Sequence, residues 1–407
     1  MSRTRFTRLF AILLALGLVA AACGDSSDDA AETTETTAAA ADDSADTTAA
    51  AADDEEMADD EEMADAHSLV GICPDPLIVQ TDWFPEPEHG YAYSLIGPDG
   101  DLDAANGVYS GPLLDTGISM EVRAGGPYIG FSPPSAQFYA DDSIFMAFVD
   151  TATAMATSET LPVTAVFAPF EVGPQILMWN PEVFSFDTFQ DIGDSGAPVL
   201  YFEGGAYMTY LLGKGFLNEA QIDASYDGSP ARFVTEDVVQ QGFASNEPWR
   251  YENQIEDWLK PVDFMLIHDS GFEIYEGTLS VKPASITEDA ECLAAVVPMF
   301  QQSQVDYMND PEAMNNRLDD IVKELDSFWT SSIEGHAAGT VAMKEFGLVS
   351  DGDNATVGDM DPARIQALID VQLPLLAAQG IETFKEGLTA EDLSTNEFLD
   401  MSIGLGF

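Results

Sequence analysis

Short apolar runs alternate with amphipathic stretches from about residue 75 to the end of the chain. Runs rich in β-branched and aromatic residues predict strands, and apolar residues at helical spacing predict helices. The expected strands span 77–83, 117–123, 144–149, 161–170, 175–179, 197–202, 262–267 and 277–281. The expected helices span 151–158, 206–212, 287–329 with an interruption near residue 310, and 362–380. Strands that alternate with helices favour an α/β fold with largely parallel sheets.

Polar residues and glycines follow three of these strands. Asp82 and Trp83 come after the first strand, Asp150 opens a helix, and Gly205 precedes another helix. In open α/β sheets, ligands bind outside the carboxyl ends of the strands and near helix N-termini. The sequence therefore predicts a ligand site that these segments share.

The segment 79–90, which reads VQTDWFPEPEHG, resembles the DWFPNxxH signature of certain ABC-importer solute-binding proteins. These proteins capture thiamine-pyrimidine precursors, and their relatives take riboflavin, nitrate, sulfonate or taurine. Further similar stretches follow in the same order at 148–151, 161–170, 202–205, 239–248 and 269–272, so the likeness covers about 75–285.

The resemblance implies a periplasmic-binding-protein type II fold, in which two α/β lobes are joined by two crossovers and close on a ligand by hinge motion. Lobe one would comprise 75–170 plus 262–407, and lobe two would comprise 171–260. The crossovers would lie near 168–173 and 258–263.

Eight residues are candidates for contact with the ligand. Trp83 could stack on a flat ring, Asp82 and Glu247 could accept hydrogen bonds from N–H groups, and helix-opening residues could bind through free backbone N–H groups. The candidates are Asp82, Trp83, Asp150, Thr151, Gly205, Tyr207, Asn246 and Glu247. Each also fits a structural role, as a core aromatic, a turn cap or a solvated acid.

The resemblance, together with these residues, implies an extracytoplasmic receptor for a small flat heterocycle, such as a thiamine pyrimidine precursor or a riboflavin-like molecule. It would act as a monomer and hand its ligand to an ABC permease. Binding of nitrate, sulfonate or taurine is the alternative within this class. A secreted enzyme of pyrimidine metabolism is the alternative from another class. The sequence shows no nucleophile–base pair and no metal-ligand spacing, so we expect neither catalysis nor a cofactor.

The N-terminal region has the features of an export signal. Basic residues precede an apolar run in residues 1–22, and the small residues Ala20 to Ala22 precede Cys23. Cys23 resembles the lipidated cysteine of a bacterial lipobox, although Ala20 stands where Leu is usual. Residues 24–66 contain 17 acidic residues and no basic residue, so we expect 23–66 to be a disordered tether from a lipid anchor on the outer face of the cell membrane.

The charge of the 407-residue chain restricts its partners. It carries 72 acidic and 14 basic side chains, a formal charge of −58. Such a surface repels phosphate backbones, which argues against nucleic-acid binding. It also steers anions away, which favours neutral or cationic heterocycles over inorganic anions.

Of the three cysteines, one follows the expected export signal and two lie in the expected folded region. If Cys23 carries the lipid, Cys73 and Cys292 remain in an oxidising compartment, where a disulfide between them is expected. Two separately buried thiols are the alternative.

Overall fold

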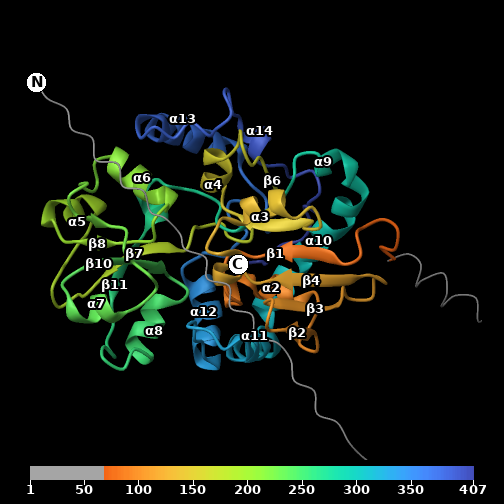
Figure 1. Cartoon of the computed structure of the whole chain (residues 1–407), viewed down its shortest axis with the longest axis horizontal. Coiled ribbons are helices and arrows are strands. Elements are labelled where there is room, and N and C mark those ends of the chain that lie inside the picture. Colours follow the sequence, from red (N-terminus) through yellow and green to blue (C-terminus); the bar gives the residue numbers. More distant parts are fainter. Residues whose placement is uncertain (1–67) are drawn as a thin grey trace, which may run out of the picture. The chain divides into compact units, whose positions relative to one another are not determined.

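The computed structural model describes residues 68–407 (Figure 1). The expected signal peptide, Cys23 and the acidic tether lie outside these residues. In the part of the chain that is described, no helix is both long and apolar enough to cross a membrane.

The first of two sheets has seven strands, in the order β2-β3-β4-β1-β5-β12-β6 (Figure 1). Their bounds are β1 Leu77–Gln80, β2 Asp101–Asp103, β3 Val108–Pro112, β4 Ser119–Arg123, β5 Met146–Val149, β6 Thr164–Phe167 and β12 Thr278–Val281. β1 is parallel to β4 and β5, whereas β12 is antiparallel to β5 and β6. We call the part of the chain built on this sheet lobe one.

The second sheet has five strands, in the order β11-β7-β10-β8-β9. Their bounds are β7 Gln175–Trp179, β8 Val199–Leu200, β9 Ile222–Asp223, β10 Val239–Phe243 and β11 Asp263–Leu266. β8 is parallel to β9 and β10, but β7 is antiparallel to β10 and β11. Both sheets are therefore mixed rather than largely parallel. We call the part built on this sheet lobe two.

The chain passes between the sheets twice. The first passage lies between β6 and β7, within 168–174, close to the expected 168–173. The second lies between β11 and β12, within 267–277, and not near 258–263 as the sequence suggested. The reason is that β11 pairs with β7 in the second sheet, so residues 263–266 belong to lobe two. The hinge role of these passages stays a prediction.

Helices and short 3₁₀ turns cover the sheets. In the first half of the described chain they are η1 Pro87–His89, α2 Gly90–Ser94, η2 Gly126–Ile129, α3 Pro134–Ala140, α4 Thr151–Ala156, α5 Phe189–Ser195, α6 Ala206–Gly213, α7 Ala231–Thr235 and α8 Glu247–Asn253. In the second half they are η3 Ile267–Ser270, α9 Ser285–Glu288, α10 Ala290–Asn309, α11 Glu312–Leu325, α12 Ile333–Glu345, α13 Pro362–Ala378 and α14 Ala390–Leu393.

The long helix α10 packs on α2 and on β6 in lobe one. Its apolar residues recur every three or four positions, as a helix with one buried face requires, and Leu293, Val297 and Phe300 are buried in the core. Gly90 at the start of α2 faces the ring of Tyr307. A Cβ atom at position 90 would lie 2.1 Å from Cζ of that ring, so glycine permits the close approach.

The C-terminal region contacts both lobes. Helix α12 packs against η1 of lobe one and α8 of lobe two. Helix α13 packs against α4 of lobe one and α6 of lobe two, and Gln372 Nε2 donates to the carbonyl oxygen of Ala206 at 3.2 Å. Residues 287–407 therefore do more than extend lobe one.

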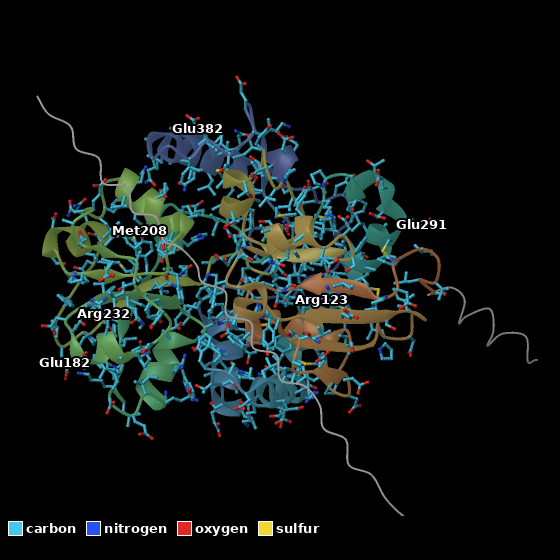
Figure 2. All side chains as sticks on the ribbon, viewed as in Figure 1. Arg123, Glu182, Met208, Arg232, Glu291 and Glu382 are labelled. Atoms are coloured by element: carbon cyan, nitrogen blue, oxygen red, sulfur yellow. A yellow bond between two sulfur atoms is a disulfide. The ribbon has the colours of Figure 1, made fainter. Side chains whose placement is uncertain are left out.

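Several of the few basic side chains are held in ion pairs at the surface. Arg123 bonds Glu121 at 3.0 Å and Asp141 at 2.9 Å, and Arg232 bonds Asp223 at 2.7 Å. Figure 2 shows Arg123, on β4 of lobe one, far from Arg232, on helix α7 of lobe two. These guanidinium groups are thus engaged with carboxylates within their own lobes.

The expected disulfide is confirmed. Cys73 is bonded to Cys292 with a Cα–Cα distance of 5.0 Å across a sequence separation of 219 residues. Both cysteines are buried. The bond ties the segment that precedes β1 to the start of α10.

Removal of this bond should destabilise the protein. A cross-link that closes so long a loop restricts the unfolded chain, so Cys73→Ser or Cys292→Ser should lower the free energy of unfolding by about 2–4 kcal/mol. Urea unfolding of the wild type and both variants, with and without reductant, would measure this. Reductant should destabilise only the wild type; equal stability of all three proteins would contradict the role of the bond.

Candidate functional site

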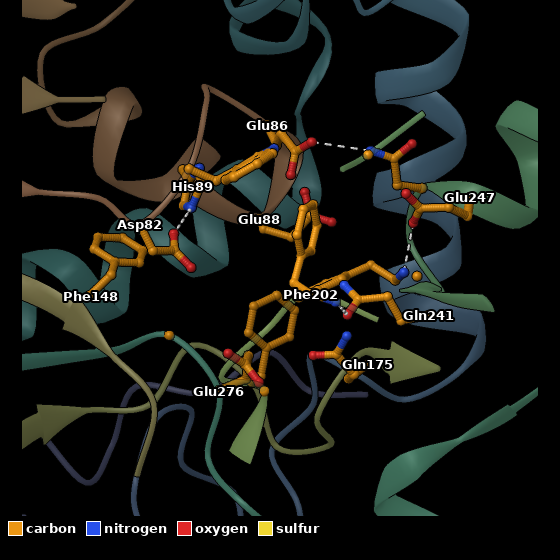
Figure 3. A pocket seen from close by; sticks show the side chains of 18 of the residues that line it. Asp82, Glu86, Glu88, His89, Phe148, Gln175, Phe202, Gln241, Glu247 and Glu276 are labelled. Atoms are coloured by element: carbon orange, nitrogen blue, oxygen red, sulfur yellow. Dashed lines mark hydrogen bonds and ion pairs between the residues drawn. The ribbon is translucent and has the colours of Figure 1, made fainter. Parts of the chain in front are cut away.

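A cavity of about 260 Å³ lies where loops from the two lobes meet (Figure 3). Its volume is below the roughly 300–1,000 Å³ of sites for drug-sized ligands, which suits a small solute. The aromatic residues that line it are Trp83, Phe148, Phe170, Phe202, Tyr207, Tyr226, Phe243 and Trp329. The polar ones are Asp82, Glu86, Glu88, His89, Gln175, Gln241, Asn246, Glu247 and Glu276.

The loop after β1 supplies one wall and is fixed by its backbone. Gln80 Nε2 donates to the carbonyl oxygens of Thr81, Arg123 and Ala124 at 2.9, 3.1 and 3.2 Å. Gly125 lies against Asp82, where a Cβ atom would come within 2.3 Å of the Asp82 carbonyl oxygen. The backbone of this loop is therefore set before any ligand arrives.

His89 holds Asp82 at the cavity wall. Its Nδ1 lies 3.0 Å from the carbonyl oxygen of Phe84 and its Nε2 lies 2.8 Å from Asp82 Oδ1. A carbonyl can only accept, so Nδ1 carries a hydrogen and donates it. The hydrogen bond between Nε2 and Asp82 Oδ1 then joins the two side chains. Both ring nitrogens of His89 are used, which makes it a positioning residue.

Three glutamates gather at one end of the cavity, two from lobe one and one from lobe two. Asn246 Nδ2 donates to Glu86 Oε1 at 3.1 Å, the Ser245 hydroxyl donates to Glu88 Oε1, and the Phe243 N–H donates to Glu247 Oε2 at 2.6 Å. The first two of these bonds connect the lobes. Figure 3 shows Glu86, Glu88 and Glu247 around this end.

Burial and mutual repulsion make these carboxyls hard to ionise. Burial raises the pKa of Glu86 well above its usual range, and the neighbouring carboxyls of Glu88, Glu247 and Asp82 raise it further. Burial also raises the pKa of Glu88 and of Glu247, while hydrogen bonds from Ser245 and Phe243 oppose the rise. The cluster holds closely spaced negative charge when it ionises.

Another part of the cavity contains Glu276, Gln175 and Gln241. Burial raises the pKa of Glu276 well above its ordinary value, and the carboxyls of Asp150 and Asp82 add to the effect. Gln241 Oε1 accepts from the Phe202 N–H at 2.7 Å and from the Tyr207 hydroxyl at 2.6 Å. These bonds hold the start of α6 against β10.

Aromatic rings form the remaining wall. The ring of Trp83 lies 5.6 Å from that of Trp329 and 6.0 Å from that of Phe202, measured between centroids. Trp329 stacks on Phe84, and the guanidinium of Arg250 stands 4.9 Å over its ring. Rings from both lobes and from the C-terminal region thus enclose the cavity.

The structure brings together six of the eight residues expected from the sequence. Those that line the cavity are Asp82, Trp83, Gly205, Tyr207, Asn246 and Glu247. Their contact with a ligand stays a prediction.

The other two expected residues lie elsewhere. Asp150 lines neighbouring hollows and caps α4, with its Oδ1 accepting from the Thr153 N–H at 2.8 Å. Thr151 is buried, and its hydroxyl accepts from the Tyr275 N–H at 3.0 Å, so it fastens α4 to the second passage between the sheets. The rule that ligands bind at the carboxyl ends of strands identified the correct edge of the sheet, but it did not predict which side chains line the cavity.

Sequence reasoning missed several lining residues. Glu86 and Glu88 lie inside the segment 79–90 but resembled ordinary surface acids in so acidic a chain. Glu276 sits in the second passage, which the sequence placed earlier. Trp329 follows α11, far from the other lining residues along the chain, and no local pattern marks it.

No protein-family model matches the sequence, and no curated protein matches it either. Solved structures do. The periplasmic aliphatic sulphonate binding protein SsuA from Escherichia coli is 11% identical, with a TM-score of 0.51 over 76% of this chain and 89% of that one. The alkanesulfonate-binding protein SsuA from Xanthomonas axonopodis pv. citri, bound to MOPS, is 13% identical, with a TM-score of 0.50 over 79% and 100%. The desulfurization enzyme DSZB is 12% identical with a TM-score of 0.46 over 81% and 99%.

Identities this low establish a shared fold and nothing about the ligand. The two mixed α/β sheets, joined by two passages, form the periplasmic-binding-protein type II fold that the sequence predicted.

The carboxyl of the half-buried Glu276 should make stability depend on pH. Because its folded-state pKa is raised, the folded protein binds the proton more tightly than the unfolded chain. This contribution to stability is complete below the unfolded pKa, about 4.3, and is lost as pH rises through the folded pKa. Glu276→Gln keeps the shape of the neutral acid and should therefore be more stable than the wild type in alkaline buffer but not near pH 4.

Thermal unfolding of the ligand-free proteins across this pH range would measure the difference. Glu273→Gln, an exposed residue nearby in the chain, is the matched control and should change little. If Glu276→Gln were no more stable than the wild type in alkaline buffer, the raised folded-state pKa of Glu276 would be contradicted.

Proposed function

We propose that this protein is an extracytoplasmic solute receptor of an ABC importer, which binds a small flat heterocycle between its two lobes and delivers it to a membrane permease. The observation that carries the proposal is the cavity itself. Residues of both lobes line it, aromatic faces enclose it, and polar groups converge on it.

Closure over a solute needs only that the closed arrangement binds it more tightly than the open one. The bonds Asn246–Glu86 and Ser245–Glu88 cross between the lobes beside the cavity, so they form only when the lobes meet there. A solute that touches both walls would stabilise the same arrangement. The two passages at 168–174 and 267–277 are the natural hinges.

The N-terminal region supports a place at the cell surface. Export by the signal in 1–22, lipidation of Cys23 and a tether over 23–66 would keep the receptor on the outer face of the membrane, close to its permease. The Cys73–Cys292 bond fits an oxidising compartment.

A second candidate is capture of nitrate, a sulfonate or taurine. It is favoured by the names of the similar structures from Escherichia coli and Xanthomonas axonopodis, which are sulfonate-binding proteins. The five carboxyl groups that line the cavity oppose it, because they repel an anion.

Enzymatic turnover is the weaker explanation of the site. Among the described residues that line the cavity, none is a serine, threonine or cysteine. The lining histidine, His89, has both ring nitrogens engaged, so it is not poised to activate a nucleophile.

Trp83 tests the site directly. A thermal-shift screen of pyrimidines, flavins, sulfonates and nitrate would first identify a solute that raises the unfolding midpoint. Trp83→Ala should then weaken binding of that solute by about 1–3 kcal/mol, because an aromatic face is lost, and calorimetry would measure it.

Trp83→Phe should retain much of the affinity, which separates loss of stacking from loss of folding. Phe346→Ala, at an exposed aromatic residue that does not line the cavity, is the control. Unchanged affinity in Trp83→Ala would remove Trp83 from the binding site.

A further inference from the structure

We propose that the bound solute is a flat organic cation whose N–H groups donate to the carboxylates of Glu86, Glu88 and Glu247. This inference rests on the proposed receptor function and specifies the chemistry of its ligand. It excludes the sulfonate class that the names of the structural neighbours suggest.

Glu88 provides the first argument, because one of its oxygens lacks a partner. The side chain lines the cavity and is only 7% exposed. Its Oε1 accepts from Ser245, but its Oε2 has no hydrogen-bond partner among the described residues. A buried carboxyl oxygen without a hydrogen-bond partner is unfavourable, and a cationic N–H group of the solute would both favour the ionised form of Glu88 and donate to this oxygen.

Gln175 provides the second argument, from another part of the same cavity. Its Nε2 is buried and has no acceptor in the described part of the chain. Figure 3 shows Gln175 beside Gln241 and below Phe202. A solute that donates to Glu88 and accepts from Gln175 would satisfy both orphaned groups. Such a molecule carries N–H donors at one place and an acceptor atom at another.

The balance of charge decides the sign of the solute. Five carboxyl groups line the cavity: Asp82, Glu86, Glu88, Glu247 and Glu276. Of the lining residues, all within the described chain, only His89 has a basic side chain, and it is already paired with Asp82.

Arg250 offsets part of this negative charge, because its guanidinium lowers the pKa of Glu86 and of Glu247, but one cation does not balance five carboxyl groups. It lines a smaller adjoining hollow, and its guanidinium stands over the ring of Trp329. A sulfonate or nitrate in the cavity would therefore meet five carboxyl groups, with the guanidinium of Arg250 in the adjoining hollow as the one Arg or Lys group described near them. A cation gains both Coulomb attraction and charge-assisted hydrogen bonds at the same place.

The aromatic walls suit a flat cation as well. A positive group over the face of Trp or Tyr is attracted by the ring quadrupole, and more strongly where water is excluded. Trp83, Trp329 and Tyr226 lie in the same lining as the carboxyls. A delocalised, planar cation of the amidinium type can stack on such rings while its edge donates to Glu88.

Three probes of matched shape and different charge test the inference: benzamidine, which is cationic, benzamide, which is neutral, and benzenesulfonate, which is anionic. Calorimetry with the whole exported protein should show benzamidine binding about tenfold or more tightly than benzamide, because charged hydrogen bonds replace neutral ones, with benzenesulfonate weakest. Benzenesulfonate binding as tightly as benzamidine would overturn the inference.

Variants locate the effect. Glu88→Gln and Glu247→Gln remove charge at nearly constant shape and should weaken benzamidine much more than benzamide. Glu252→Gln, an exposed residue on the same helix as Glu247, should change neither. Equal loss for both probes, or no loss in either cavity variant, would contradict a role for these carboxylates as counter-ions.

The failure of this inference differs from the failure of the receptor proposal. Absence of binding by all three probes overturns the assignment of a flat cation. The receptor proposal falls only if the wider solute screen also leaves the unfolding midpoint unchanged. Binding of a neutral or anionic solute that depends on Trp83 would keep the receptor and reject the cation.

Discussion

The site depends on how firmly the segment between β1 and α2 is held. The side chain of Gln80 bonds three backbone carbonyls below it, and Gly125 lets a neighbouring loop approach Asp82 closely. At the C-terminal end of the segment, Gly90 leaves room for the ring of Tyr307 from α10 to pack closely. Four lining residues with ionisable side chains come from this one short segment: Asp82, Glu86, Glu88 and His89. Without these anchors their mutual repulsion would spread them apart.

The closely spaced carboxyl groups repel one another in the empty cavity, and a bound cation would relieve this repulsion. Burial and repulsion raise the pKa values of Glu86, Glu88, Glu247 and Glu276. The fold holds these groups together because hydrogen bonds from Ser245, Asn246 and Phe243 offset part of the unfavourable energy. A site that is destabilised when empty gives a complementary ligand more to gain, which is a common feature of binding sites.

The C-terminal region connects the two lobes on separate elements. Helix α12 contacts η1 and α8, helix α13 contacts α4 and α6, and the segment between α11 and α12 contributes Trp329 to the cavity. If the lobes rotate relative to one another, α12 and α13 must therefore move relative to the elements of at least one lobe that they contact. The fold is the same as that of the sulfonate-binding protein from Escherichia coli. Part of the lining nevertheless comes from residues 287–407, beyond the stretch 75–285 in which the sequence resembles ABC-importer solute-binding proteins.

The sequence by itself determined the fold class and the segment that carries the site. Strands and helices follow from apolar periodicity between near neighbours, and the run at 79–90 is a continuous motif, so both can be recognised locally. It also predicted the Cys73–Cys292 disulfide, since few cysteines leave few choices, and the structure confirms the bond. Only the tertiary structure decided that Glu86, Glu88, Glu247, Glu276 and Trp329 line one cavity, whereas Thr151 is bonded to Tyr275 and is not among the lining residues. These residues are far apart along the chain, and burial among partners from the other lobe, which no local pattern encodes, sets their chemistry.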